Sequence, residues 1–319
     1  MDCPDAVTFC FDLQQVQPLP RTPIPYAFYA RQISFYNFCI VPMDSKNPKF
    51  YQWSEEDSRR GSIEVGSALL SYLNEIDLAG MSKVRLFCDG CEGQNKNSYI
   101  VHTLLFWLVN KSPENIQEIQ LTYPVRGHSF LPADRVFGRV EKDLRKKPVI
   151  IHKEEYYEIY QNHGEIKKLG EGWKTLDIKS LGEHYKKLDG MRDIKRVVLK
   201  KHLVTKKIGR RIQTIIKYLV NTYKNFRNES DEERIPVCLL KRGKRHPTEL
   251  LQKSYCKGLS AAKKQDVDNL MKKQFGDDWR INEEFRWYKN LLENENLNQD
   301  EDDEGTCDCI EEEVNNVLV

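Results

Sequence analysis

The stretch Val7–Val16 reads VTFCFDLQQV and sets the first element of the fold. Apolar and polar residues alternate along it and no breaker interrupts it, which is typical of a strand. Two more strands are expected downstream, ISFYNFCIV at Ile33–Val41 and KFYQW at Lys49–Trp53, after the turn sequence DSKNP. The proline-rich stretch Pro18–Pro25 should interrupt regular structure. Three consecutive strands predict an antiparallel meander.

Beyond this meander, helical and strand patterns alternate. Their periodicity predicts a helix at Gly61–Ile76, a strand at Val84–Asp89, a mostly buried helix at Ser98–Val109, a strand at Ile116–Val125 and a helix at Pro132–Arg145. The order is therefore three strands, then helix, strand, helix, strand and helix. Few folds share that order, and it resembles the RNase H-like superfamily. We expect an α/β fold with an RNase H-like mixed sheet flanked by helices.

Two aspartates lie at positions in the predicted strands that suggest a functional site. Asp12 lies inside the first strand between two apolar residues, where strand propensity and burial both disfavour a carboxylate. Asp89 closes the fourth strand, at the end where an open sheet presents its crevice to a ligand. If the first and fourth strands are neighbours, as in an RNase H-like sheet, these two acids lie side by side.

The helix expected at Pro132–Arg145 supplies two candidates for a third acid. Asp134 lies near its start, and Glu141 follows seven residues later on the same face, about 10 Å along the axis. Clustered carboxylates are unfavourable unless a cation neutralises them, and oxygen-only ligands suit Mg²⁺ or Mn²⁺. Two such ions can activate the attacking group and stabilise the leaving oxygen in phosphodiester chemistry. We predict Asp12, Asp89 and Asp134 as metal-binding catalytic acids, with Glu141 as the alternate.

Each acid taken alone also has an ordinary structural explanation. Asp134 suits the dipole at a helix start, and Glu141 can pair with Arg145 four residues on. Asp89 precedes a glycine and fits a plain turn. Asp12 has no such explanation, and the joint placement of the acids therefore favours the metal site.

Two unusual strings surround these acids. FCDGCEGQNKN spans Phe87–Asn97, and RGHSFLPADRVFGRVE spans Arg126–Glu141. Together with FDLQQVQPLP and ARQISFYNF near the start, they resemble a transposon-derived family of unknown function, DUF7869, whose members are similar to DDE-type transposases. The resemblance covers about residues 5–150 well, and the following region to about 290 more loosely. It implies an RNase H-like core in which Asp12, Asp89 and an acid of DRVFGRVE match the DDE positions.

Polar residues in the same strings are candidates for contacts with nucleic acid. Gln94, Asn95 and Lys96 follow the fourth-strand acid and can bind phosphate oxygens or hold the carboxylates in place. His128 and Ser129 precede the third acid, where a donor can reach a scissile phosphate, although a lone loop histidine more often makes local hydrogen bonds. The chain begins close to the first catalytic strand. The upstream DNA-binding region of such transposases, and end-specific transposition with it, is therefore not expected.

The cations that follow the core point to a polyanion. Lys206, Lys207, Arg210 and Arg211 precede apolar residues at helical spacing over Ile212–Tyr223, which predicts a basic helix lying along phosphates. An ordinary solvated helix face is the competing interpretation. The basic run KRGKRH further along can act in the same way or as a nuclear localisation signal.

Charge and pattern divide the chain into three parts. We expect an RNase H-like core over residues 5–150 and a basic, mainly helical region over 151–292, in which Trp279, Phe285, Trp287 and Tyr288 form an aromatic cluster. An acidic disordered tail is expected over 293–319.

Composition excludes several classes of protein. Of the 319 residues, 31% are charged, no run of about 18 apolar residues occurs, and the start lacks a secretory pattern. The nine cysteines are scattered, which favours reduced thiols. We expect a protein that is nuclear, or nuclear and cytoplasmic, that is not secreted and that binds DNA and Mg²⁺ or Mn²⁺. A membrane partner and a small-molecule cofactor are not expected, and homo-oligomerisation is left open.

Two functions fit these expectations. The intact acids favour a Mg²⁺-dependent core that cleaves DNA strands or transfers them. The alternative is a domesticated, non-catalytic relative that uses the same fold to bind nucleic acid or protein. A sugar-kinase-like use of the fold is disfavoured because no glycine-rich phosphate loop occurs in the sequence.

Overall fold

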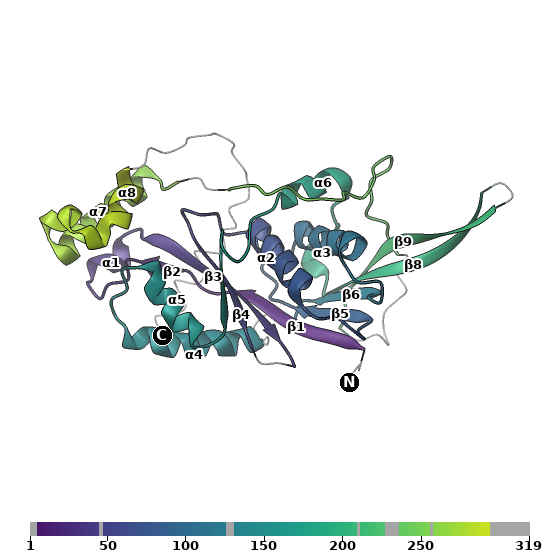
Figure 1. The fold of residues 1–319 in the computed structure, drawn as a ribbon, viewed down its shortest axis with the longest axis horizontal. Coiled ribbons are helices and arrows are strands. Elements are labelled where there is room, and N and C mark those ends of the chain that lie inside the picture. Colours follow the sequence, from purple (N-terminus) through teal and green to yellow (C-terminus); the bar gives the residue numbers. More distant parts are fainter. Residues whose placement is uncertain are drawn as a thin grey trace.

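A nine-stranded mixed sheet forms the centre of the protein (Figure 1). The computed structural model describes residues 5–44, 47–125, 131–208, 211–226, 236–255 and 258–293. The strands are β1 (Ala6–Leu13), β2 (Gln17–Leu19), β3 (Ile33–Pro42), β4 (Lys49–Ser54), β5 (Lys83–Phe87), β6 (Glu118–Thr122), β7 (Glu165–Lys168), β8 (Arg196–Ile208) and β9 (Arg211–Tyr223). Their order is β7-β4-β3-β1-β5-β6-β8-β9, with β2 paired to β3. The protein is therefore a mixed α/β protein.

Strand direction determines which ends share an edge of the sheet. β3 runs antiparallel to both β1 and β4, whereas β1, β5 and β6 are mutually parallel. β8 is antiparallel to β6, and β9 is antiparallel to β8. The carboxyl ends of β1, β4, β5 and β6 consequently lie along one edge of the sheet.

Helices cover both faces of the sheet (Figure 1). They are α1 (Tyr26–Tyr29), α2 (Ser62–Glu75), α3 (Ser98–Asn110), α4 (Pro132–Lys146), α5 (Lys153–Gln161), α6 (Leu181–His184), α7 (Ala261–Phe275) and α8 (Arg286–Glu293). One core cluster contains α2 and α3, and a second contains α4, α5, α7 and α8. Among the described residues, none of the helices has the length and apolar character needed to cross a bilayer.

Alternation along β1 distributes its side chains between the two faces. Phe9 and Phe11 are fully buried against the α2 and α3 side, and burying each contributes about 2 to 3 kcal/mol. Cys10 lies in the cluster of α4 and α5. Because side chains two residues apart point to the same face of a strand, Asp12 shares the α4 side with Cys10.

The element order predicted for the first half is confirmed. Strands and helices at β1, β3, β4, α2, β5, α3, β6 and α4 follow each other as expected. The aromatic cluster near the end is also present, since Trp279, Phe285 and Tyr288 are buried in one core with the partly buried Trp287. The proline-rich stretch differs from expectation only at its start, because β2 extends to Leu19, and α1 begins directly after Pro25.

The helix predicted at Ile212–Tyr223 is wrong, because this segment is strand β9. Its apolar spacing fits a helix, but Ile, Thr, Val and Tyr dominate it, and such side chains favour a strand where a partner is available. The available partner is β8, which is itself paired to β6. The region after residue 150 therefore has mixed structure, since β7, β8 and β9 extend the central sheet beside helices α5 to α8.

Candidate functional site

The register of two parallel strands brings the first two predicted acids together. Cys10 of β1 is paired with Phe87 of β5 at the end of their ladder. Asp12 and Asp89 each lie two residues beyond this pair, so they are neighbours on the same face of the sheet. Both carboxylates are half-buried. The backbone N–H of Leu13 donates to Oδ1 of Asp12 over 2.8 Å, which leaves Oδ2 of that carboxylate without a hydrogen bond among the described residues.

The first turn of α4 carries the third predicted acid to the same place. The backbone N–H of Ala133 lies near the Cys10 thiol and opposes the rise of the Cys10 pKa that burial causes, so the start of α4 lies over β1. Asp134 caps α4 by accepting a hydrogen bond from the backbone N–H of Leu131 through Oδ2, over 2.7 Å. The structural explanation for Asp134 therefore holds, and it also places this carboxylate beside β1.

The three aspartates form one electrostatic cluster. Burial raises the pKa of Asp12 well above its usual value, and the negative charges of Asp89 and Asp134 raise it further. Burial and the charge of Asp89 also raise the pKa of Asp134. Like charges in a half-buried place disfavour ionisation unless a cation lies nearby. The cluster therefore has the charge and the oxygen donors that suit a divalent cation.

The residues that follow Asp89 shape the loop between β5 and α3. Nδ2 of Asn95 and the backbone N–H of Cys91 both donate to Oδ1 of Asp89. Lys96 is buried, donates to the carbonyl of Arg192 over 2.7 Å and lies 5.2 Å above the ring of Tyr123. Asn95 therefore holds the carboxylate in place, and Lys96 anchors the loop. Gln94 is the one of the three predicted residues that is partly exposed.

Glu141 lies in a different network from the aspartates. Its Oε1 accepts hydrogen bonds from Nε2 of Gln14 over 3.1 Å and from Nε2 of Gln17 over 3.0 Å. Gln14 also accepts from Asn37 and from the Tyr160 hydroxyl, so the network is largely buried. Asp134 interacts electrostatically with Asp12, whereas Glu141 is not among the groups with the largest effects on the Asp12 pKa. The two candidates for the third acid therefore have separate surroundings.

Arg60 is a residue that the sequence reasoning missed. It lies between β4 and α2, at the same edge as the aspartates, and its Nη2 donates to the carbonyl of Gln14 over 3.4 Å. Its charge opposes the rise in the Asp12 pKa. Its Nε is buried and has no hydrogen-bond partner among the described residues. An arginine at a strand-to-helix junction on the carboxyl edge is the sequence signal that would have identified it.

The structure describes only some of the remaining residues that were predicted to bind nucleic acid. His128, Ser129 and Arg210 lie outside the described residues. Lys206 belongs to β8, as does Lys207, and Arg211 belongs to β9. These three cations are thus on strands instead of the predicted helix, far along the chain from the aspartates.

The metal site is not pre-formed in the part of the chain that the structure describes. Within those ranges, no three His, Cys, Asp or Glu side chains gather closely enough to hold a metal ion. The donor set still fits Mg²⁺ or Mn²⁺, because three carboxylates with oxygen donors share one electrostatic cluster. Movement of these side chains would be needed to bring the three carboxylates onto one ion.

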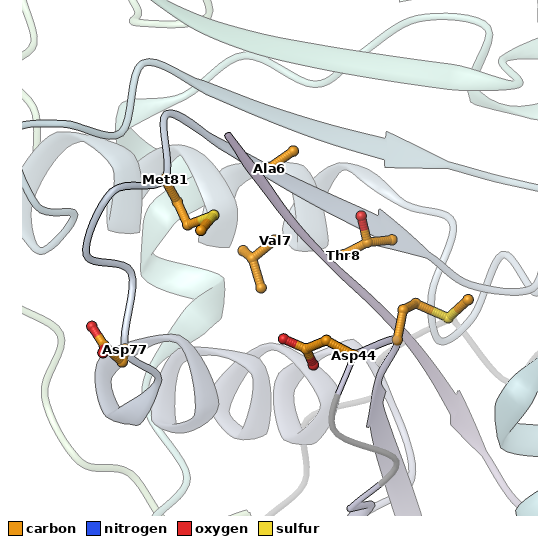
Figure 2. A pocket seen from close by; sticks show the side chains of 7 residues that line it. Ala6, Val7, Thr8, Asp44, Asp77 and Met81 are labelled. Atoms are coloured by element: carbon orange, nitrogen blue, oxygen red, sulfur yellow. The ribbon is translucent and has the colours of Figure 1, made fainter. Parts of the chain in front are cut away.

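A small open pocket lies at the other end of β1 (Figure 2). Ala6, Val7 and Thr8 line it from the strand, and Figure 2 shows Asp77 and Met81 at its rim. These residues are at the amino end of β1, whereas the aspartate cluster lies at its carboxyl end. The pocket is therefore separate from the candidate site.

Fold and site together define a mixed α/β protein with an aspartate cluster at the carboxyl edge of its sheet. Residues 47–214, just over half of the chain, match the family described as Domain of unknown function (DUF7869), and the chain belongs to that family. Asp89 and Asp134 lie inside the matched range, and Asp12 precedes it. Neither the comparison with curated proteins nor the comparison with solved structures gave a match.

Proposed function

We propose that this protein is a transposase-related core that cleaves or transfers DNA phosphodiester bonds with the help of Mg²⁺ or Mn²⁺. Strand topology supports an RNase H-like fold as part of this proposal. The central order β4-β3-β1-β5-β6, with only β3 running against the others, and helices α2 and α3 in the connections are the features of that fold.

The juxtaposition of Asp12 and Asp89 at the ends of β1 and β5 carries the proposal. Asp134 joins them from α4, and the three carboxylates would hold the divalent cation. When bound, such an ion polarises a phosphoryl oxygen and lowers the pKa of a coordinated water or hydroxyl. Without a bound cation, the structure gives no evident reason for an aspartate at this position in a strand.

The other residues of this edge support the same chemistry. Asn95 holds Asp89 by donating to its Oδ1, which leaves the second oxygen of that carboxylate for a cation. Arg60 offers a guanidinium whose buried Nε has no hydrogen-bond partner among the described residues, and an arginine is well suited to the oxygens of a phosphate group. Arg60 therefore binds the phosphodiester next to the aspartates.

The decisive experiment compares metal binding and DNA nicking in two variants. Mn²⁺ is titrated into the wild type, Asp12→Asn and Asp44→Asn, and each protein is assayed for nicking of supercoiled plasmid. Asp44 is an exposed acid near the opposite end of β1, so its variant matches the change in charge. We expect nicking and tight Mn²⁺ binding to be lost in Asp12→Asn only. Equal behaviour of all three proteins would rule out the catalytic site.

A non-catalytic binding module is the second candidate, and one observation favours it. Each carboxylate already uses one oxygen in a hydrogen bond, and no three acids of the described residues meet at metal-binding distance. Under this alternative the wild type binds DNA or protein but nicks no plasmid at any Mn²⁺ concentration.

We also propose that the protein acts in the nucleus, where its DNA substrate lies. The basic run Lys241–His246 supports this, because Arg242, Lys244 and Arg245 are exposed and available to an import receptor. Imaging of a fluorescent fusion, with and without Arg242→Gln, Lys244→Gln and Arg245→Gln together, tests it.

A further inference from the structure

Strands β8 and β9 extend well beyond the sheet as a two-stranded ribbon (Figure 1). Only Arg196–Lys200 of β8 pairs with β6, whereas the pairing with β9 continues to Ile208. We call residues 201–208 and 211–217 the arm. Within the described part of the chain no third strand supports the ribbon along the arm, and a two-stranded ribbon alone is marginally stable in water.

The arm leaves the sheet at the edge opposite the aspartates. Arg196 is paired with Thr122 at the carboxyl end of β6, and Lys200 is paired with Glu118 at its amino end. The strand then continues past Glu118, in the direction away from the carboxyl edge. The arm is therefore a surface separate from the candidate active site.

The charge of this segment is of one sign. Residues 201–217 include six Lys and Arg residues and one histidine, and they contain no Asp or Glu. At its base, Lys201 donates to the carbonyl of Pro113, while Lys217 is exposed. A strongly cationic ribbon is complementary to a polyanion, and two such ribbons would repel each other.

An exposed apolar pair lies on one face of the arm. Leu203 and Ile216 are directly opposite each other in the ladder, with 76% and 50% of their surfaces exposed. Apolar side chains that project from a thin ribbon gain stability only when a partner covers them. The arm thus combines a cationic character with a small apolar surface.

We propose that the arm is a docking surface for double-stranded DNA, with the ribbon lying in the major groove. The major groove of B-form DNA admits a two-stranded ribbon and presents thymine methyl groups to apolar side chains such as Leu203 and Ile216. The deep, narrow major groove of A-form RNA does not admit one. The inference rests on the proposed function for a DNA partner, but it requires no catalysis and no metal, because the arm lies away from the aspartates.

The test measures binding of the full chain to a fluorescent DNA duplex of about 25 base pairs by anisotropy, in EDTA and over a range of salt. One variant combines Lys206→Gln, Lys207→Gln and Arg211→Gln. We expect its affinity to fall at least about tenfold and its salt slope to decrease by about 2 to 3, because each missing cation leaves one phosphate without its neutralising partner. The control combines Lys272→Gln, Lys273→Gln and Arg286→Gln, which are exposed cations at the other end of the molecule, and should change affinity less than about twofold.

A second variant tests the apolar pair without changing charge. Leu203→Thr with Ile216→Thr places β-branched, strand-favouring residues at both positions and removes apolar surface. We expect weaker duplex binding, by about threefold to tenfold, with an unchanged salt slope, because the variant buries less apolar surface against the bases and neutralises the same phosphates. Circular dichroism and thermal melting show whether each variant is folded.

Three results would overturn the arm as a DNA surface. The first is unchanged affinity in both folded arm variants, and the second is equal affinity for duplex RNA. The third is a change in oligomeric state by light scattering with no change in DNA affinity, which would identify a second copy of the chain as the partner. Arm-dependent binding by a wild type that never nicks plasmid would support this inference and remove the proposed catalysis.

Discussion

At the carboxyl ends of β1 and β5 three aspartates gather, whereas beyond the amino end of β6 the arm carries cations and no acid. The first region concentrates negative charge in a half-buried place, and the second spreads positive charge along a projecting ribbon. The charge of each region suits a partner of the opposite sign, but the two proposed partners differ in kind. A compact anionic cluster suits a small cation, and an extended cationic ribbon suits a long polyanion. The two regions should therefore respond to different mutations.

The largest expected effect concerns the third acid. Asp134→Asn should reduce Mn²⁺-dependent nicking at least about a hundredfold, because a metal ligand matters more than an outer-shell partner. Glu141→Gln should change it by less than about threefold, since Gln retains an acceptor for Gln14 and Gln17. Both variants should bind duplex DNA in EDTA as the wild type does. A stronger defect in Glu141→Gln would show that Glu141, on the third turn of α4, joins Asp12 during the reaction.

A substitution of Asn95 tests how the aspartates at the carboxyl edge of the sheet are held in place. Asn95→Ala removes the donor to Oδ1 of Asp89 and should weaken Mn²⁺ affinity by about tenfold to a hundredfold. The matched control is Gln94→Ala, because Gln94 is adjacent and half-buried but does not donate to Asp89. Calorimetric titration of Mn²⁺ measures both. Equal affinity of the two variants would mean that this loop does not organise the site.

A substitution of Arg60 tests whether the carboxyl edge of the sheet, where the aspartates lie, also binds the phosphate. Arg60→Gln should raise the KM of plasmid nicking about tenfold, since charge-assisted hydrogen bonds contribute about 1.5 to 3 kcal/mol. The loss of this cation should also raise the Asp12 pKa further and move the pH profile of activity to higher pH. Arg60→Lys should restore the pH profile better than the KM. A KM that does not change would place the phosphate elsewhere.

The smallest expected effect is on stability in the absence of metal. The pKa of Asp12 is higher in the folded protein than in the unfolded chain, where it is about 3.9. The contribution of Asp12 to the free energy of unfolding is therefore fully present below about pH 4. It is lost as the pH rises through the pKa of Asp12 in the folded protein.

Thermal melting in EDTA measures this effect directly. Asp12→Asn should melt a few degrees above the wild type at pH 7.5, and the difference should vanish towards pH 4. Mn²⁺ should reverse the order at pH 7.5 by stabilising only the wild type. If Asp12→Asn melts below the wild type in EDTA at pH 7.5, the charges of the aspartate cluster do not destabilise the folded protein.

Local pattern was sufficient where the spacing of the apolar residues fits only one kind of element. The alternation in Val7–Val16 predicted β1, and the helical spacing in Pro132–Arg145 predicted α4. The same reasoning failed at Ile212–Tyr223, where apolar spacing fits both a helix and a strand. Pairing with β8 decided between them, and that pairing partner lies outside the segment itself.

The choice between Asp134 and Glu141 shows the same limit. Seven residues on a helix place both acids on one face, so spacing cannot say which one lies over Asp12. The position of α4 across β1 brings Asp134 to the aspartates and Glu141 to the glutamines. Arg60 was missed for a related reason, since only the sheet order brings the β4 to α2 junction beside β1.

The sequence alone determined the unusual strand position of Asp12 and the relative order of eight elements, β1, β3, β4, α2, β5, α3, β6 and α4, because periodicity and propensity act over a few residues. It also determined the charge of the segment that forms the arm, which is a property of composition. Only the tertiary structure decided that Asp12 and Asp89 are neighbours and that the cations lie on a strand ribbon pointing away from them. Both facts depend on strand pairing between segments distant in sequence, which a local pattern does not encode.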